Sequence, residues 1–253
     1  MNDAVLVTEG LTRHFGGLAA VNGVSIACER GRVHAVIGPN GAGKSTLVNM
    51  LSGDLVPSSG RVTLRGADIT GFAPHRISRL GIGRSYQKTN IFSAFTAFEN
   101  CRLAAQSRAP RALHLFTDAA AYRPTCEPAD RALAAAGLAG RGDRIASTLS
   151  HGEQRQLEIA MVLATQPKVL LLDEPLAGMG ADEAARMVQL LKALAPGHAI
   201  LLVEHDMDAV FAVADVITVM VNGQVLESGP PARIRASAAV QQAYLGDPPV
   251  GAP

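Results

Sequence analysis

The stretch G-P-N-G-A-G-K-S-T at residues 38–46 decides the fold of this chain. It fits the pattern of a phosphate-binding loop, in which a glycine, four residues and then Gly-Lys-Ser/Thr follow one another. The glycines leave the backbone N–H groups open to triphosphate oxygens. The apolar run V-H-A-V-I (33–37) predicts a buried strand before the loop, and T-L-V-N-M-L (46–51) predicts an amphipathic helix after it. This order indicates a nucleotide site rather than an ordinary glycine-rich turn.

The residue types in the loop match the chemistry of phosphate binding. Lys44 can place a positive charge on the β and γ phosphates, and the hydroxyl of Ser45 can ligate Mg²⁺. The helix after the loop points its positive end at the phosphates. The residues that we expect to hold the nucleotide here are Gly38, Pro39, Asn40, Gly41, Ala42, Gly43, Lys44, Ser45 and Thr46.

A second motif, V-L-L-L-D-E-P, spans residues 169–175. Its short apolar run is typical of a strand that is buried on both faces of a parallel sheet. Ligands of open α/β sheets bind where such strands end, and two carboxylates stand at that place. We expect Asp173 to hold Mg²⁺ through water and Glu174 to polarise the attacking water. A surface Asp-Glu-Pro turn is the alternative.

A third motif, L-S-H-G-E-Q, spans residues 149–154 and predicts the start of a helix. Ser150 is a plausible N-cap, with Glu153 three residues later as in a capping box. The expected buried face of this helix consists of Leu157, Ala160, Met161 and Ala164. Taken alone, the motif indicates no more than a well-capped helix.

Together and in this order, the motifs resemble the ATP-binding subunit of an ATP-binding-cassette (ABC) transporter, over roughly residues 5–246. The resemblance implies an α/β fold: a P-loop NTPase cassette with a RecA-like parallel-sheet core, an N-terminal antiparallel β region and an inserted helical subdomain. L-S-H-G-E resembles the family signature L-S-G-G-Q, which binds the γ-phosphate of ATP held by the opposite subunit. That role passes to Ser150 and Gly152, while His151 and Glu153 depart from the usual Gly and Gln.

Three single residues gain roles from the resemblance. Gln87, in I-G-R-S-Y-Q, resembles the glutamine that reaches Mg²⁺ and the attacking water. His205, in V-E-H-D, resembles the histidine that contacts the γ-phosphate, and Phe15, in R-H-F-G-G, matches the aromatic residue that stacks on adenine. Gly180 stands where the family usually has an aspartate, so the contact that its side chain makes across the dimer cannot be carried over.

Composition is in accord with this class. The formal net charge is +1, which gives no reason to expect nucleic acid as a partner. The three cysteines form no C-x-x-C pair, which suits a reducing cytosol. The most apolar region, residues 209–221, is shorter than the ~20 residues of a membrane span and contains Asp215. We expect partner chains to provide any path through a membrane.

Strand and helix signals outline one domain. We expect N-terminal strands at 4–8, 23–28 and 61–65, parallel core strands at 33–37, 169–172 and 200–203, and a hairpin at 216–227 with an Asn-Gly turn. The segment 107–130 contains prolines without a clear period and predicts loops. The expected division is a single domain over 1–253, with an ATPase core at about 1–94 and 166–246, a helical subdomain at about 95–165 and a disordered tail at 247–253.

Further resemblances suggest the kind of transporter. Residues 85–100 resemble the family stretch that contacts the coupling helix of the membrane subunit, and L-E-I-A (157–160), L-A-G-M-G (176–180) and A-Y-L-G (243–246) resemble subunits that serve branched-chain amino-acid or urea uptake. The resemblance implies a peripheral protein at the cytoplasmic face of the membrane. Its partners would be transmembrane permease subunits, a second ATPase subunit and, indirectly, a solute-binding protein. Uptake of branched-chain amino acids is the expected function. The alternatives are urea or another small polar solute, a soluble ABC ATPase without a transporter, and a nucleotide-binding scaffold that barely hydrolyses ATP.

Overall fold

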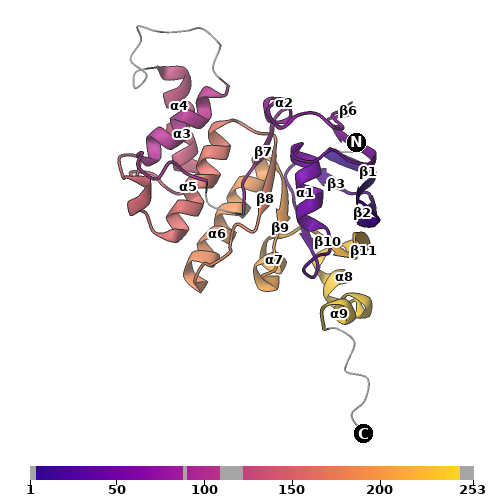
Figure 1. Cartoon of the computed structure of the whole chain (residues 1–253). Helices are drawn as coiled ribbons and strands as arrows, with labels where there is room; N and C mark the ends of the chain where they lie inside the picture. Colours follow the sequence, from indigo (N-terminus) through magenta and orange to yellow (C-terminus); the bar gives the residue numbers. More distant parts are fainter. Residues whose placement is uncertain (1–3, 88–89, 109–121, 246–253) are drawn as a thin grey trace.

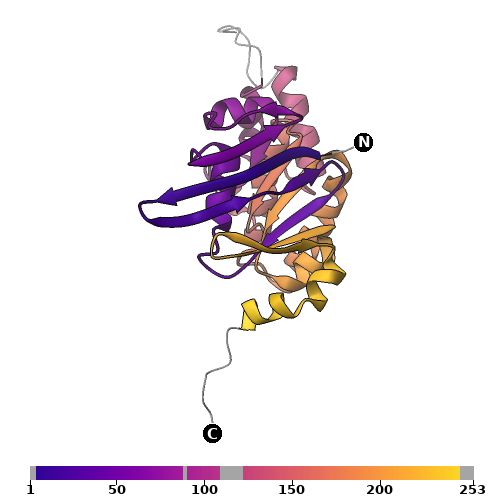
Figure 2. The same ribbon diagram turned by 90° about the vertical axis from the view of Figure 1, so that its right-hand side faces the viewer.

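A computed structural model describes residues 4–87, 90–108 and 122–245. The expected disordered tail at 247–253 lies outside the described residues. The chain forms two β-sheets with helices packed around them (Figures 1 and 2). One sheet is mainly parallel and lies at the centre, and the other is antiparallel and contains the N-terminal strands.

The central sheet has six strands in the order β11-β10-β4-β9-β8-β7. Neighbours are parallel except β10 and β11, which are joined at Asn222 and Gly223, both with positive φ as a type I′ turn requires. Every residue of β4, β8 and β9 is buried, which confirms the expected core strands. The bounds are Val33–Ile37 (β4), Ile82–Arg84 (β7), Val169–Asp173 (β8), Ala199–Val203 (β9), Val216–Val221 (β10) and Gln224–Gly229 (β11).

Alternating side chains separate the two faces of this sheet. Val169 and Leu171 pack on one face with helix α1 (Lys44–Ser52). Leu170 and Leu172 pack on the other face, in the cluster that also holds residues of α5 (His151–Ala164), α6 (Ala181–Leu194) and α7 (Met207–Val213). The helix after the phosphate loop and the helix that starts after Ser150 therefore lie on opposite faces.

The antiparallel sheet confirms the expected N-terminal β region, but with different strand bounds. Strand β1 does not end at residue 8, and the expected strand at 23–28 is divided between β2 and β3. At the division the hydroxyl of Thr8 donates to the carbonyl of Val24 and accepts from the N–H of Ile26, beside a backbone bond from the N–H of Thr8 to the carbonyl of Ile26. The bounds are Ala4–Phe15 (β1), Leu18–Val24 (β2), Ala27–Glu29 (β3), Ser59–Leu64 (β5) and Ala67–Asp68 (β6).

Three helices, α3 (Ala97–Gln106), α4 (Arg123–Ala135) and α5, share a separate apolar cluster beside the core (Figure 1). The expectation of loops over 107–130 is wrong from residue 123 onward. Pro124 lies in the first turn of α4, where a missing N–H costs little, and Pro128 lies further inside the helix. Packing of Ala129, Ala132 and Leu133 in the cluster outweighs the second proline.

The remaining helices are α2 (Pro74–Leu80), α8 (Pro231–Ala236) and α9 (Ala238–Leu245). In the part of the chain that the structure describes, the longest helices, α5 and α6, each have 14 residues. A bilayer span needs about 20 apolar residues. None of the described helices has the length and apolarity of such a span.

Candidate nucleotide site

The phosphate loop leads into a helix N-terminus that no side chain caps. Gly43, the residue before α1, has a left-handed backbone with φ 96°, and the first turn of α1 holds no acidic residue. A Cβ at Gly43 would lie 2.3 Å from the carbonyl oxygen of Ala20, so the loop can pass strand β2 only with a glycine there. The first N–H groups of α1 are thus left for an anion.

Lys44 lies across this loop. Its Nζ donates to the carbonyl oxygens of Gly38 at 2.6 Å and Pro39 at 3.0 Å. The side chain is buried, and burial lowers the pKa of its ammonium group, while the charges of Glu174 and Asp173 oppose that shift. The loop cation and the two carboxylates at the end of β8 are therefore neighbours.

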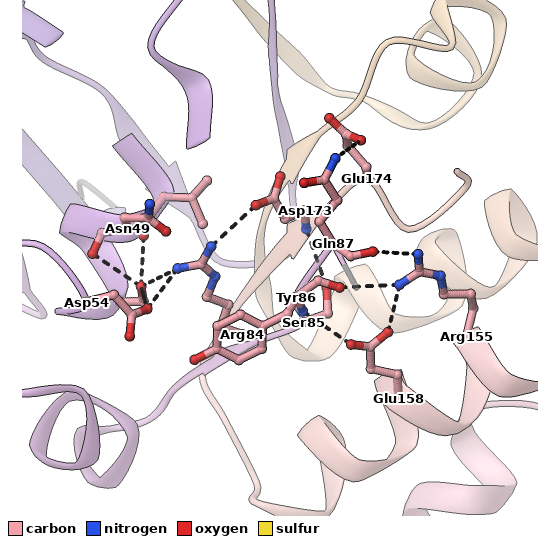
Figure 3. Close-up of polar contacts among 12 residues, drawn as sticks. Asn49, Asp54, Arg84, Ser85, Tyr86, Gln87, Arg155, Glu158, Asp173 and Glu174 are labelled. Atoms are coloured by element: carbon pink, nitrogen blue, oxygen red, sulfur yellow. Dashed lines mark hydrogen bonds and ion pairs between the residues drawn. The ribbon is translucent and has the colours of Figure 1, made fainter. Parts of the chain in front are cut away.

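Asp173 ends β8 with one carboxylate oxygen engaged and one open. Its Oδ2 forms an ion pair with Arg84 at 3.3 Å, whereas the buried Oδ1 has no hydrogen-bond partner among the described residues. Burial raises the pKa of this carboxyl, and the guanidinium of Arg84 acts against that shift. Arg84 also pairs with Asp54 at 2.8 Å and so connects β8 to the end of α1 (Figure 3).

Glu174 is the point where Gln87 and His205 meet. Its Oε2 lies 3.0 Å from Nε2 of Gln87 and 3.2 Å from Nε2 of His205. The backbone of Glu174 is left-handed, with φ 52°, which is uncommon for a residue other than glycine. The turn after β8 thus aims the carboxylate at two side chains that come from the ends of two other strands. Such backbone strain is often kept at functional sites.

Two residues of this site are not found from the sequence motifs. The first is Arg84, and a cation inside a short strand just before Gln87 is the signal that points to it. The second is Glu204, which is fully buried and accepts the N–H of Leu176 at 2.7 Å and that of His205 at 3.1 Å. Burial raises the pKa of Glu204, and these hydrogen bonds counteract it. Its signal is an acidic residue at the end of an apolar strand.

The L-S-H-G-E stretch begins α5 as a capping box. Ser150 Oγ accepts the N–H of Glu153 at 3.2 Å, and Glu153 Oε2 accepts the N–H of Ser150 at 2.9 Å. The N–H of Gly152 donates to Glu183 of α6 at 3.3 Å. Ser150 and Gly152 thus lie together at the start of α5, a helix that packs on the opposite face of the sheet from α1.

Phe15 is the last residue of β1, and its side chain is 48% exposed. The guanidinium carbon of Arg13 lies 4.9 Å from the centre of its ring. An exposed aromatic ring at a strand end is available to stack on a flat ligand. The role of Phe15 in adenine binding stays a prediction.

Comparison with known proteins decides the family. The family model described as ABC transporter matches residues 21–177. The chain belongs to the ABC transporter family. It is an ATP-binding cassette, with the fold that the resemblance implied. ABC cassettes bind nucleotide and are ATPases coupled to transport.

Curated relatives and solved structures match over nearly the whole cassette. The high-affinity branched-chain amino acid transport ATP-binding protein BraF of Pseudomonas aeruginosa is 40% identical, over 98% of this chain and 100% of the relative. The corresponding LivG of Escherichia coli is 38% identical over the same shares. An ATP-binding cassette of an ABC transporter solved in its ADP conformation is 31% identical, with a TM-score of 0.85, and covers 96% of this chain and 99% of that structure.

The residues of this cassette fit a magnesium ion shared with a nucleotide. Among the described residues, no three His, Cys, Asp or Glu side chains gather as a metal site of their own. Mg²⁺ in nucleotide enzymes typically takes one or two protein oxygens, with phosphates and waters completing its shell. The unpartnered Oδ1 of Asp173 and the exposed hydroxyl of Ser45 are oxygens of that kind.

Proposed function

We propose that this cassette hydrolyses MgATP to power an importer of branched-chain amino acids. The observation that carries the proposal is the convergence of Gln87 and His205 on a single oxygen of Glu174. A carboxylate held at the end of a parallel strand, beside a phosphate loop and its lysine, has the placement that a general base for water requires.

The residues divide the work of phosphoryl transfer. Glu174 accepts the proton of the attacking water, while Gln87 and His205 orient that carboxylate and sense the γ-phosphate. Lys44 and the amides of the loop stabilise the charge on the transferred phosphoryl group. Mg²⁺, held by Ser45, Asp173 and Gln87, would supply Lewis-acid charge compensation to the phosphates. Phe15 would hold the adenine.

A second cassette completes each site in this proposal. Ser150 and Gly152 begin α5 on one face of the sheet, and the phosphate loop feeds α1 on the other. That arrangement supports a dimer in which the Ser150 and Gly152 of one subunit close the ATP site of its partner. The helical part, at about residues 95–165, would pass the motion to transmembrane permease subunits at the cytoplasmic face of the membrane. A solute-binding protein would deliver cargo from the other side.

The cargo class rests on relatives. BraF and LivG are named as branched-chain amino acid transport proteins, and they match the cassette end to end. A urea or other small-solute importer is the alternative within the class. A soluble ABC ATPase without a membrane partner is the alternative outside it.

The test is copurification of the cassette with its membrane subunits, followed by ATPase assays in proteoliposomes with a solute-binding protein. Leucine, isoleucine and valine should stimulate hydrolysis, and urea should not. Glu174→Gln is the control: it should bind ATP and keep the complex intact but turn over very slowly. Stimulation by urea alone would show that urea is the cargo. Near-normal turnover of Glu174→Gln would show that Glu174 is not the general base.

A further inference from the structure

A buried ion pair in α5 forms hydrogen bonds with the backbone of Tyr86 and Gln87. Arg155 and Glu158 stand one turn apart, are 7% and 5% exposed, and pair at 3.0 Å. Arg155 donates to the carbonyl oxygens of Gln87 at 2.6 Å and Tyr86 at 3.3 Å. Glu158 accepts the N–H of Tyr86 at 3.3 Å (Figure 3).

Burial raises the pKa of Glu158, and its hydrogen bonds with Arg155 and with the backbone N–H of Tyr86 counteract the shift. A buried ion pair is costly to desolvate and by itself contributes little net stability. Here the two charged side chains also bind the backbone of Tyr86 and Gln87. Arg155 donates to both carbonyl oxygens, and Glu158 accepts the N–H of Tyr86.

Gln87 is therefore attached at two ends. Its side-chain amide donates to Glu174, and its backbone carbonyl accepts from Arg155. The first attachment leads to the end of β8, and the second leads to the helix whose first turn contains Gly152. The two attachment points, the side-chain amide and the backbone carbonyl, belong to the same residue, so a shift of one is passed directly to the other.

We propose that Arg155 and Glu158 are positioning residues that fix the Gln87 amide against Glu174 according to where α5 lies. This inference rests on the proposed hydrolysis by Glu174. A shift of α5 moves the two carbonyl groups and the N–H group that the pair holds, and with them the Gln87 side chain. Placement of Ser150 and Gly152 on a partner's nucleotide is in this way linked to the orientation of the general base.

The test is a double-mutant cycle on the full chain. Arg155→Met removes the hydrogen bonds to the carbonyls of Tyr86 and Gln87 but keeps the apolar part of the side chain. Gln87→Ala removes the amide that is positioned against Glu174. Arg155→Met should lower kcat for ATP by about tenfold and change KM little, since a misplaced catalytic group can cost up to ~100-fold. In the Gln87→Ala background the same change should have almost no effect on kcat. Arg155→Lys, which retains the charge and one donor direction, should recover part of the rate.

A matched control separates positioning from folding. Gln154 precedes Arg155 in α5 and donates to the carbonyls of Ala146 and Leu149, away from the gripped segment. Gln154→Ala should leave kcat near that of the parent and act additively with Gln87→Ala. In thermal melting, Arg155→Met should lower the melting temperature by the same amount in the parent chain and in the Gln87→Ala background.

Hydrogen exchange gives a readout that needs no hydrolysis. The N–H group of Tyr86 should exchange faster in Arg155→Met and Glu158→Gln, but not in Gln87→Ala. Equal effects of Arg155→Met on kcat in both backgrounds, or unchanged exchange at Tyr86, would overturn the inference. If the parent chain itself showed no hydrolysis that depends on Glu174, the proposed function would fail instead, and the exchange result would still decide whether the pair holds the segment.

Discussion

The N–H of Gly152 donates to Oε1 of Glu183 at 3.3 Å, so a carboxylate occupies the backbone donor that we assign to a partner's γ-phosphate. A Cβ built at residue 152 would lie 2.7 Å from the same oxygen, which shows how closely the two helices approach here. The negative charge of Glu183 repels an incoming phosphate, and its carboxylate already accepts the N–H of Gly152 that the phosphate would need. In the dimer that we propose, ATP therefore has to displace Glu183.

We expect Glu183→Ala to tighten the ATP-bound dimer. Measured by sedimentation in a Glu174→Gln background, the dissociation constant should fall by about tenfold, which corresponds to about 1.4 kcal/mol. Asp182→Ala is the matched control, because Asp182 stands in the same first turn of α6 and is exposed. A weaker dimer in Glu183→Ala, or an equal gain in Asp182→Ala, would contradict the assignment.

Ser150 should act on the ATP of the opposite subunit. Ser150→Arg alone should abolish hydrolysis, because the side chain is too large where it faces a bound γ-phosphate. Mixing this chain with Glu174→Gln chains produces dimers in which one site carries both defects and the other carries neither. Steady-state assays of the mixture should therefore recover activity that neither parent has. Normal hydrolysis by Ser150→Arg alone would mean that L-S-H-G-E (149–153) is only the capped start of a helix.

Lys44→Ala should weaken nucleotide binding itself. The ammonium group lies over the carbonyls of Gly38 and Pro39, and its removal leaves the phosphates without a direct cation from the loop. We expect the dissociation constant for MgATP to rise by about 100-fold, or roughly 2.7 kcal/mol, in isothermal titration calorimetry. An unchanged affinity would argue against the proposed loop geometry.

His34 should make the cassette less stable in mild acid. Its ring is buried between the carbonyl of Ala27 at 3.0 Å and the hydroxyl of Thr218 at 2.7 Å. Burial lowers the pKa of His34 from its ordinary value of 6.5, while the hydrogen bond with Ala27 and the charge of Glu29 oppose the shift. Below 6.5 the unfolded chain binds a proton at His34 that the folded chain resists.

The free energy of unfolding should therefore fall as pH drops through that value, with a slope of up to about 1.4 kcal/mol per pH unit from this group, and level off below the folded pKa. Urea unfolding at several pH values checks this. His34→Gln should flatten the slope even if it lowers stability overall, and His75→Gln, on the exposed surface of α2, should not. A slope that is the same in all three chains would rule His34 out.

Much of the fold follows from local pattern. The buried runs before the phosphate loop, before Asp173 and before His205 predicted β4, β8 and β9 because a strand covered on both faces must be apolar throughout. Ser150 and Glu153 predicted the start of α5 because a capping box is formed within four residues. Local pattern misplaced an element where a side chain bonds to the backbone between two strands, as at Thr8, and where packing outweighs a proline, as in α4.

By itself the sequence determined which residues form the phosphate loop, the two carboxylates at the end of β8 and the start of α5, because each is encoded by neighbours along the chain. Only the tertiary structure decided that Gln87 and His205 reach the same oxygen of Glu174, that Arg84 leaves one oxygen of Asp173 open, and that Arg155 holds the Gln87 backbone. The partner of a charged side chain depends on which distant elements pack beside it. Where both charges are buried, as in Arg155 and Glu158, burial makes the partner obligatory, because an unpaired charge in the interior is too costly to keep.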